Sequence, residues 1–320
     1  MTLAAFEMQS RDSPARDSDN RPDVIVPILR SGILAREFCR SHARANVDAV
    51  FERSLYLRAG DEFICLGQPA IGNGPLTLIA DLRPLMELAL QRGRSALITS
   101  RNITFGNAVR FDLDHCEPWS PPRWPVSPST TRLADTYAQL AQRSAIEAPQ
   151  EGFARHVFDA HEPVTSLPPL ARVTCERIAD FAGWLVAVLN GDRSSVENFP
   201  APVAGLIGLG PGLTPSGDDF LVGVLASLDS LGEKETHAVL ARAIIDASPA
   251  LTSPLSRCLL NATAAGHMGE NLHRAVSSVM MGDIDAAVAA VGKIGHSSGW
   301  DMMAGIGTTI RIVAAARVRS

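Results

Sequence analysis

The chain has 320 residues, of which 46% are hydrophobic and 20% are charged, and its formal net charge is -5. This composition is typical of a globular protein with room for two domains or one large one. The acidic balance and the absence of basic clusters argue against nucleic acid as a partner. Because no apolar run is long enough to cross a bilayer and the N-terminus lacks a signal-peptide core, we expect no membrane partner and a cytoplasmic location.

Residues 1–21 mix Ser, Asp, Arg and Pro and are predicted to form a disordered leader. Residues 22–125 are predicted to form a small β-rich domain, with a short strand at Val24–Leu29, a basic helix at Ser31–Ala45 and a helix or loop around Arg83–Leu90. Whether its strands form a barrel or an open sheet is left open. The other predicted strands are short apolar or alternating runs at Val50–Leu57, Glu62–Leu66, Leu76–Ile79, Ala96–Thr99 and Ala108–Leu113.

Residues 126–169 are rich in Pro and polar side chains and are predicted to connect two domains, with one helix at Thr131–Ile146. Residues 170–320 are predicted to form a mainly α-helical C-terminal domain, because apolar residues recur at helical spacing between short Gly and Ser-Pro turns. The predicted fold class is therefore α+β. The predicted C-terminal helices are Leu170–Leu189, Lys234–Ala247, Pro254–Ala265, Glu270–Met281, Ile284–Val291 and Trp300–Val318.

The most informative stretch is Gly205–Leu228, in which glycines lead into Thr-Pro-Ser-Gly-Asp-Asp and an apolar helical run. Thr214 followed by Pro215 predicts a helix start with the threonine as its cap. Glycines before it let the backbone approach a ligand, and free N–H groups at a helix start attract anions. Asp218 and Asp219 instead attract a cation or the amide and ammonium groups of a substrate. We therefore expect a small polar ligand with charged and donor ends.

A second copy of this motif lies at Gly295–Gly305, where Ser-Gly-x-Asp, two apolar residues, a small residue and Gly recur in the order of Ser216–Gly223. Two copies predict two helix starts that face one cleft. Each copy also has a plain structural explanation, because Ser, Thr and Asp are common caps and glycine permits close packing. The predicted substrate-binding residues are Gly210, Gly212, Thr214, Ser216, Gly217 and Asp218 in the first copy and Ser297, Ser298 and Gly299 in the second.

Asp219 and Asp301 occupy matching positions and are predicted to be catalytic, orienting a substrate amide or a metal-bound water. Consecutive helical residues point different ways, so Asp218 is expected to face solvent or a backbone N–H. His296 is a predicted acid or base near neutral pH, or else a surface histidine bonded to its loop. Asn73, in a Gly-Asn-Gly-Pro turn, is the remaining substrate-binding candidate, although a turn asparagine is the simpler explanation.

The remaining patterns narrow the chemistry. The Thr252–Ser256 helix start is interpreted as plain capping. The five cysteines lack a CxxC pair and the histidines lack ligand spacing, so no metal ligands are predicted, and Mg²⁺ held by the carboxylates is the one cofactor that remains open. Because no GxSxG, HExxH or Cys/His pairing occurs, any reaction here is expected to depend on positioning and charge stabilisation.

GLGPGLTPSGDDFLVG together with GHSSGWDMMAGI resembles the AllH-like family, with weaker support from IGNGPLTL and from TSPLS followed by LLNATAAG. The resemblance runs roughly from Val47 to the C-terminus. It implies a subunit of oxamate carbamoyltransferase, which moves a carbamoyl group reversibly between oxalurate and phosphate to give oxamate and carbamoyl phosphate in allantoin and purine catabolism. It also implies companion subunits, including an FdrA-like protein. The Ser-x-Arg-Thr-Arg signature of classical carbamoyltransferases is missing, and Ser100–Thr104 is interpreted as a strand turn.

Three functions stay open at this point. The first is a catalytic or co-catalytic carbamoyltransferase subunit, in which backbone N–H groups of both helix starts hold the anion. The second is a non-catalytic assembly subunit, in which Gly223 and Gly305 pack against a partner. The third is a stand-alone metal-dependent hydrolase that uses Asp218, Asp219 and Asp301, but the repeated Ser-Gly-x-Asp pattern itself contains no histidine or glutamate ligand.

Overall fold

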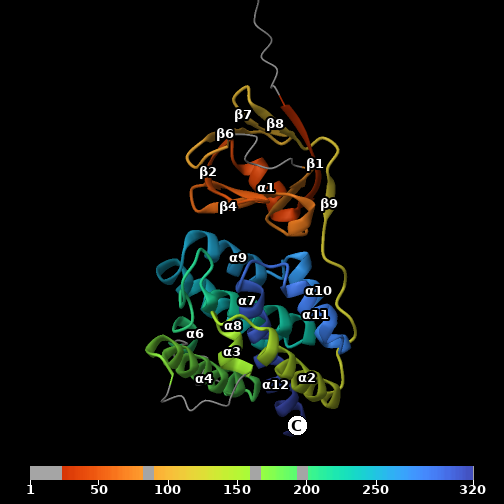
Figure 1. Ribbon diagram of the computed structural model, residues 1–320, viewed down its shortest axis with the longest axis vertical. Coiled ribbons are helices and arrows are strands. Elements are labelled where there is room, and N and C mark those ends of the chain that lie inside the picture. The colour runs from red at the N-terminus through yellow and green to blue at the C-terminus, as the bar shows by residue number, and fades with distance from the viewer. Residues whose placement is uncertain (1–23, 82–89, 159–166, 193–200, 320) are drawn as a thin grey trace, which may run out of the picture.

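The computed structural model describes residues 24–81, 90–158, 167–192 and 201–319, and it stacks a sheet region on a helical region (Figure 1). All its strands precede residue 120, and most of its helices follow residue 129. This confirms the predicted α+β fold class and its order. The domain boundaries stay predictions, and the leader and most of the Arg83–Leu90 segment lie outside the described residues.

The sheet closes into a barrel, which answers the question that the sequence left open. Among the described residues its strand order is β5-β4-β3-β2-β6-β7-β8-β1-β9, and β1 also pairs with β5. The length of β1 permits this, because its first half pairs with β8 and its second half with β5 and β9. The strands are β1 (Val24–Gly32), β2 (Arg44–Val50), β3 (Ser54–Ala59), β4 (Glu62–Gly67), β5 (Thr77–Ala80), β6 (Ser95–Ile98), β7 (Asn102–Phe105), β8 (Val109–Asp112) and β9 (Glu117–Trp119).

Alternating side chains fill the barrel together with helix α1 (Ile33–Ser41). Leu55 and Leu57 of β3 are fully buried, as are Ile103 and Phe105 of β7, and Phe38 of α1 packs into the same core. The predicted Ser31–Ala45 helix was too long, because residues from Arg44 onward pair with β3 and β6 instead. Strands β2, β7 and β9 were not predicted, since each is short or lies inside a run interpreted otherwise.

The helical region agrees closely with the predicted helices. α10 and α11 have the predicted bounds, while α3, α6 and the short 3₁₀ helix η1 (Pro69–Ile71) in the sheet region were not predicted. Among the helices that the structure describes, none combines the length and the apolar character needed to cross a membrane. The helices are α2 (Thr130–Glu147), α3 (Ala154–Phe158), α4 (Pro169–Leu189), α6 (Ala201–Ala204), α7 (Ser216–Leu231), α8 (Lys234–Leu251), α9 (Pro254–Ala264), α10 (Glu270–Met281), α11 (Ile284–Val291) and α12 (Ser298–Arg319).

Helices α7 and α12 cross with their backbones in contact, at the centre of the helical region. A Cβ atom on Gly223 would lie far closer than 3.0 Å to the carbonyl oxygen of Met302, and one on Gly305 equally close to that of Phe220. Phe220 and Met302 are themselves matching positions of the two motif copies, so the crossing is approximately two-fold symmetric. Because both glycines pack inside this chain, they are not available to a partner subunit, which removes the packing argument for the assembly function.

The barrel is fixed to the helical region by polar contacts between residues distant in sequence. The backbone N and the Nδ2 of Asn73 donate to Glu270 Oε2 at 3.0 and 2.6 Å, and the amide of Glu270 donates back to the carbonyl of Asn73. Arg257 at the start of α9 forms a 2.8 Å ion pair with Asp61 of the β3–β4 turn. Asn73 therefore anchors the barrel on the start of α10.

Candidate functional site

The two motif copies build the same local structure at the starts of α7 and α12. The amide of Gly217 donates to the carbonyl of Leu209, and the amide of Gly299 donates to the carbonyl of Ile294, both at 2.9 Å. A Cβ atom on either glycine would collide with another backbone carbonyl. Gly217 and Gly299 therefore let each loop fold tightly over its own helix start, and their amides are already used.

Helix α7 starts one residue later than it would if Thr214 were its N-cap. Pro215 is the N-cap residue and makes no side-chain cap bond, and Ser216 is the first helical residue. The Oγ1 of Thr214 lies 3.2 Å from the Oγ of Ser298 instead. The capping prediction for Thr214 was wrong, and the same contact joins the two helix starts directly, as the repeated motif predicted.

The serine hydroxyl of each motif copy faces the aspartate carboxyl group of the other copy. The hydroxyl of Ser298 faces the carboxyl group of Asp219, and the hydroxyl of Ser216 faces that of Asp301. Burial raises the pKa of both aspartates, and each hydroxyl offsets part of that rise. Ser216 and Ser298 are matching positions, as are the two aspartates, so the contacts are reciprocal across the crossing of α7 and α12. We call these four residues the Ser–Asp pair site.

Asp218 has a different environment from its neighbour. Its Oδ1 accepts the amide of Gly208 at 2.8 Å, and its Oδ2 accepts the hydroxyls of Ser256 at 2.6 Å and of Thr252. The expectation that Asp218 faces a backbone N–H is therefore confirmed. Ser253 caps α9 as interpreted from sequence, with its Oγ accepting the amide of Ser256 at 3.1 Å. The hydroxyls of Thr252 and Ser256, on either side of this cap, also connect α9 to α7 through Asp218, which the sequence analysis did not predict.

Asp219 and Asp301 are buried carboxyl groups with incomplete hydrogen bonding. Their side chains are 2% and 1% exposed, and the Oδ2 atom of each has no hydrogen-bond partner among the described residues. Burial raises the pKa of Asp219 well above its ordinary value, and the charge of Asp301 raises it further. Burial raises the pKa of Asp301 to about 6. The pair therefore retains a proton at pH values where ordinary aspartates are fully ionised.

A more exposed layer of loop backbone and hydroxyls covers this pair. Gly210 and Gly212 have positive φ angles of 109° and 108°, which glycine adopts without strain. The amides of Gly210, Gly212, Leu213 and Thr214 donate to no atom of the described residues. Because both aspartates are buried, a ligand would reach the loop amides and hydroxyls first, and the cleft that the two motifs predicted stays a prediction.

A third segment, missed by the sequence analysis, completes the site. The amide of Phe153 donates to Asp301 Oδ1 at 2.5 Å, and Gly152, at a positive φ of 93°, leaves room for that carboxyl group. The segment was predicted only as part of the connection between domains. A single Gly-Phe pair carries no periodic pattern, so its approach to a residue 148 positions later had no sequence signal.

Two predicted site residues lie apart from the Ser–Asp pair site. His296 has a side chain that is 86% exposed, and its Nε2 lies 4.0 Å from Glu151 Oε2 at the rim of the second loop. Asn73 is committed to Glu270. Ser297 is half-buried, and its carbonyl accepts the amide of Asp301.

Within the described part of the chain, no group of three or more His, Cys, Asp or Glu side chains is arranged to hold a metal ion.

These features define an α+β protein whose helical region is organised around a duplicated, glycine-rich helix start. The family model described as the AllH family N-terminal domain matches residues 29–118, nearly the whole barrel. The model described as oxamate carbamoyltransferase subunit AllH matches residues 206–310, which include both motif copies. The two matches together take in more than half of the sequence, and the chain belongs to the AllH family. No solved structure matches it.

Proposed function

We propose that this protein is a subunit of a carbamoyltransferase-type enzyme that acts on oxalurate, oxamate, carbamoyl phosphate or phosphate at the paired helix starts. The family description supports the carbamoyltransferase role. The observation that carries the site is the reciprocal contact of Ser298 with Asp219 and of Ser216 with Asp301. The Oδ2 atoms of these aspartates have no hydrogen-bond partner in the described part of the chain. Buried carboxyl groups with raised pKa values in an incomplete polar network are typical of functional sites.

The reaction requires one proton to move. When phosphate attacks the carbamoyl carbon of oxalurate, the bond from that carbon to the oxamate nitrogen breaks, and the proton lost by the phosphate must reach that nitrogen. A carboxyl group whose pKa is raised well above its ordinary value is suited to accept and return such a proton. Asp219 would do so through the hydroxyls of Ser298 and Thr214, which face it, while burial and then the charge of Asp301 raise its pKa.

The exposed layer supplies groups that recognise an anion. The loop amides from Gly210 to Thr214 and the hydroxyls of Ser297 and Ser298 would donate to carboxylate or phosphoryl oxygens. The anion-holding role predicted for the first-turn amides moves to this loop, because the amides of Gly217, Asp218 and Asp219 donate to backbone carbonyls. Neither motif contains Lys or Arg, so we infer that companion subunits, including an FdrA-like one, add positive charge.

The setting of this proposal is the cytoplasm and the catabolism of allantoin and purine nitrogen. All five cysteines are free, which fits a reducing compartment. Mg²⁺ enters only as a possible companion of the phosphate, because the described carboxylates do not gather into a metal site. Its effect is therefore tested by adding it, with and without a chelator, in the assay below.

The test is phosphate-dependent release of oxamate from oxalurate by the complete complex with its companion subunits. We expect Asp219→Asn and Asp301→Asn each to lower kcat by about 100-fold or more, the usual scale for loss of a proton-transfer group. Asp246→Asn is the matched control, because Asp246 is paired with Arg242 on the exposed side of α8 and should leave activity unchanged. Full activity in both of the first two variants, with assembly intact, would exclude this site.

A further inference from the structure

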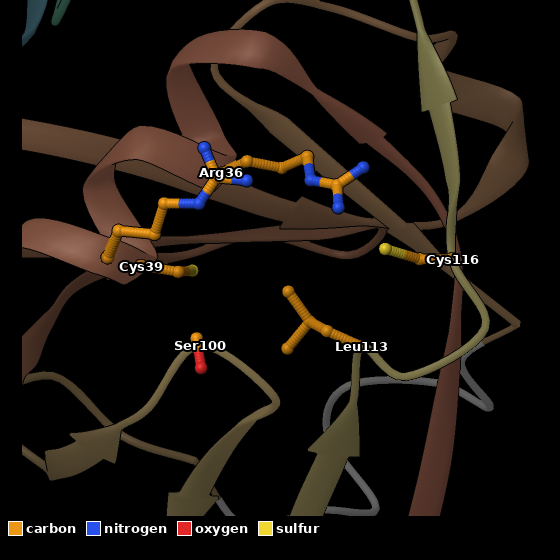
Figure 2. A pocket seen from close by; sticks show the side chains of 6 residues that line it. Arg36, Cys39, Ser100, Leu113 and Cys116 are labelled. Atoms are coloured by element: carbon orange, nitrogen blue, oxygen red, sulfur yellow. The ribbon is translucent and has the colours of Figure 1, made fainter.

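A polar cavity lies in the barrel, apart from the paired helix starts. Its volume is about 110 Å³. Helix α1 forms one wall, the β6–β7 turn another, and the segment between β8 and β9 a third (Figure 2). The lining residues are Arg36, Cys39, Arg40, Ser100, Leu113 and Cys116.

The charge of this cavity is positive and uncompensated. Two arginines line it and no carboxylate does. Arg36 and Arg40 make no ion pair or hydrogen bond with any described residue, whereas Arg101 beside the cavity is bound in a fork by Asp114 at 2.6 and 3.0 Å. A guanidinium group offers five donors in a fixed plane that suit carboxylate and phosphate oxygens.

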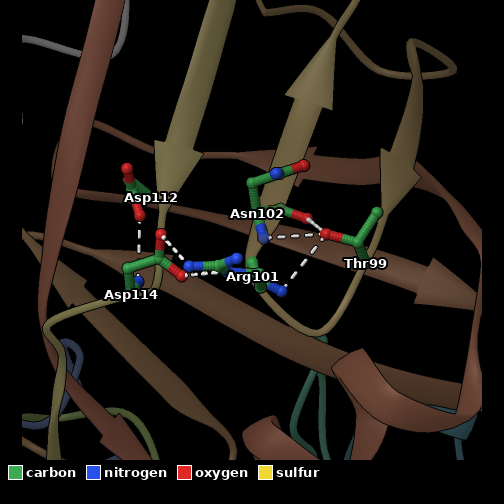
Figure 3. A network of polar contacts seen from close by, with 5 residues as sticks. All are labelled: Thr99, Arg101, Asn102, Asp112 and Asp114. Carbon is green, nitrogen blue, oxygen red and sulfur yellow. Dashed lines mark hydrogen bonds and ion pairs between the residues drawn. The ribbon is translucent and has the colours of Figure 1, made fainter.

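The wall opposite α1 is held in place by its own network (Figure 3). The Oγ1 of Thr99 accepts the amides of Arg101 and Asn102 at 3.2 and 3.0 Å, and the amide of Leu113 donates to the carbonyl of Arg101 at 2.8 Å. The Ser100–Thr104 stretch begins in the β6–β7 turn, as interpreted from sequence, but it continues as strand β7 from Asn102. This network fixes Ser100 and Leu113 at the cavity and neutralises Arg101, so the positive charge comes from α1.

The thiol of Cys39 adds no negative charge to the cavity at neutral pH. Figure 2 shows Cys39 and Cys116 on opposite sides of the cavity. Burial raises the pKa of Cys39 to about 12, so its thiol stays protonated. The Oγ of Ser31 lies 3.4 Å from the Sγ of Cys116 and holds it at the other side.

We propose that this cavity binds a small oxyanion, a phosphate or a carboxylate, between Arg36, Arg40 and the hydroxyl of Ser100. The volume supports this size class, because a cavity of about 150 Å³ holds a molecule the size of benzene, and this smaller cavity is suited to a small oxyanion. Two charge-assisted donors on one rigid helix favour such an anion over a neutral molecule. This site is independent of the paired helix starts.

The test uses Cys116 as a reporter in the full chain. Its rate of alkylation by iodoacetamide is followed by peptide mass spectrometry, with Cys175 of α4 as an internal reference, while inorganic phosphate or oxalate replaces chloride at constant ionic strength. We expect phosphate, oxalate or both to slow alkylation of Cys116 and not of Cys175. The probe that acts at the lower concentration tells whether the site prefers a phosphoryl or a carboxylate group.

The variant Arg36→Ala with Arg40→Ala should raise the half-protecting concentration by about tenfold or more, the loss expected for charge-assisted hydrogen bonds. Arg44→Ala is the matched control, because the exposed side chain of Arg44 on β2 makes no ion pair or hydrogen bond with the described residues, and its loss should not change protection. The proposal fails if neither anion protects Cys116 in the unmodified chain. It also fails if the double variant is protected as well as the unmodified chain.

Discussion

The starts of α7 and α12 carry the same motif in different surroundings. At α7, Asp218 is completely bonded by the glycine-rich loop and by α9, whereas Trp300 occupies the matching position at α12 and is buried. The aspartates that both copies share, Asp219 and Asp301, each keep one oxygen without a hydrogen-bond partner among the described residues. This difference indicates that the unshared aspartate stabilises the fold, and it supports the proposal that the shared pair takes part in the chemistry.

The difference between the two neighbouring aspartates, Asp218 and Asp219, is tested by replacing each of them in turn. Asp218→Ala should lower the free energy of unfolding by about 4 kcal/mol, because it leaves two hydroxyls and an amide buried without their acceptor. Asp219→Ala should cost about 1 kcal/mol or less, since the hydroxyls of Thr214 and Ser298 still contact each other. Urea unfolding of both variants measures this, and equal losses would contradict it.

The symmetric crossing itself is tested by filling its glycine contact. Gly305→Ala should lower the free energy of unfolding by about 3 kcal/mol, because the new methyl group meets the backbone of Phe220 and the helices must separate. Gly183→Ala on α4 is the matched control, since nothing lies within 4 Å of its Cβ position. It should stabilise the chain by about 0.5–1 kcal/mol. Similar losses in both variants would show that the crossing is not close-packed.

The raised pKa values predict how stability depends on pH. The folded chain holds the proton of Asp301 up to a pKa of about 6, against the ordinary 3.8. Folding therefore favours the protonated form of Asp301, so the contribution of this group to stability is full below about pH 4, falls as pH rises through about 6 and is lost above that. The fall should be about 2–3 kcal/mol for this group, and Asp219 should add to it in the same direction.

Unfolding in urea across this pH range, compared with Asp301→Asn, isolates the effect. The stability of the variant should not show this fall. Measured as the change from its value at low pH, the free energy of unfolding above pH 6 should be higher for the variant than for the unmodified chain. A variant that follows the unmodified chain at every pH would mean that Asp301 is ionised in the folded state as easily as in the unfolded one.

The smallest expected effect separates the two serines. Ser298→Ala should raise the pKa of Asp219 further, and Ser216→Ala that of Asp301, because each hydroxyl stabilises the ionised carboxylate that it faces. Each substitution should cost about 1 kcal/mol. Carboxyl titration by NMR assigns each shift, and the reciprocal account is wrong if Ser298→Ala moves Asp301 more than Asp219.

Much of this architecture was predictable because it is encoded locally. Helical spacing gave α10 and α11 their bounds, and the repeat of Ser-Gly-x-Asp indicated that two helix starts meet. Three other features depend on distant partners: the closure of β1 on β5, the conversion of the predicted helix end at Arg44 into β2, and the approach of Phe153 to Asp301. Local pattern carries no information about such contacts, and for the same reason Thr214 was taken as a cap.

The central claim is that the paired helix starts bind one small anion, and thermal unfolding of the full chain with oxalurate, oxamate, carbamoyl phosphate and phosphate tests it most directly. We predict that at least one of these raises the Tm of the unmodified chain and of the control Asp246→Asn. Measured in chains that also carry Arg36→Ala and Arg40→Ala, so that the barrel cavity binds no anion, the increase should persist with Asp246→Asn and be absent with Asp219→Asn and with Asp301→Asn, while the unliganded folds persist. An undiminished increase in both of these variants would contradict the account.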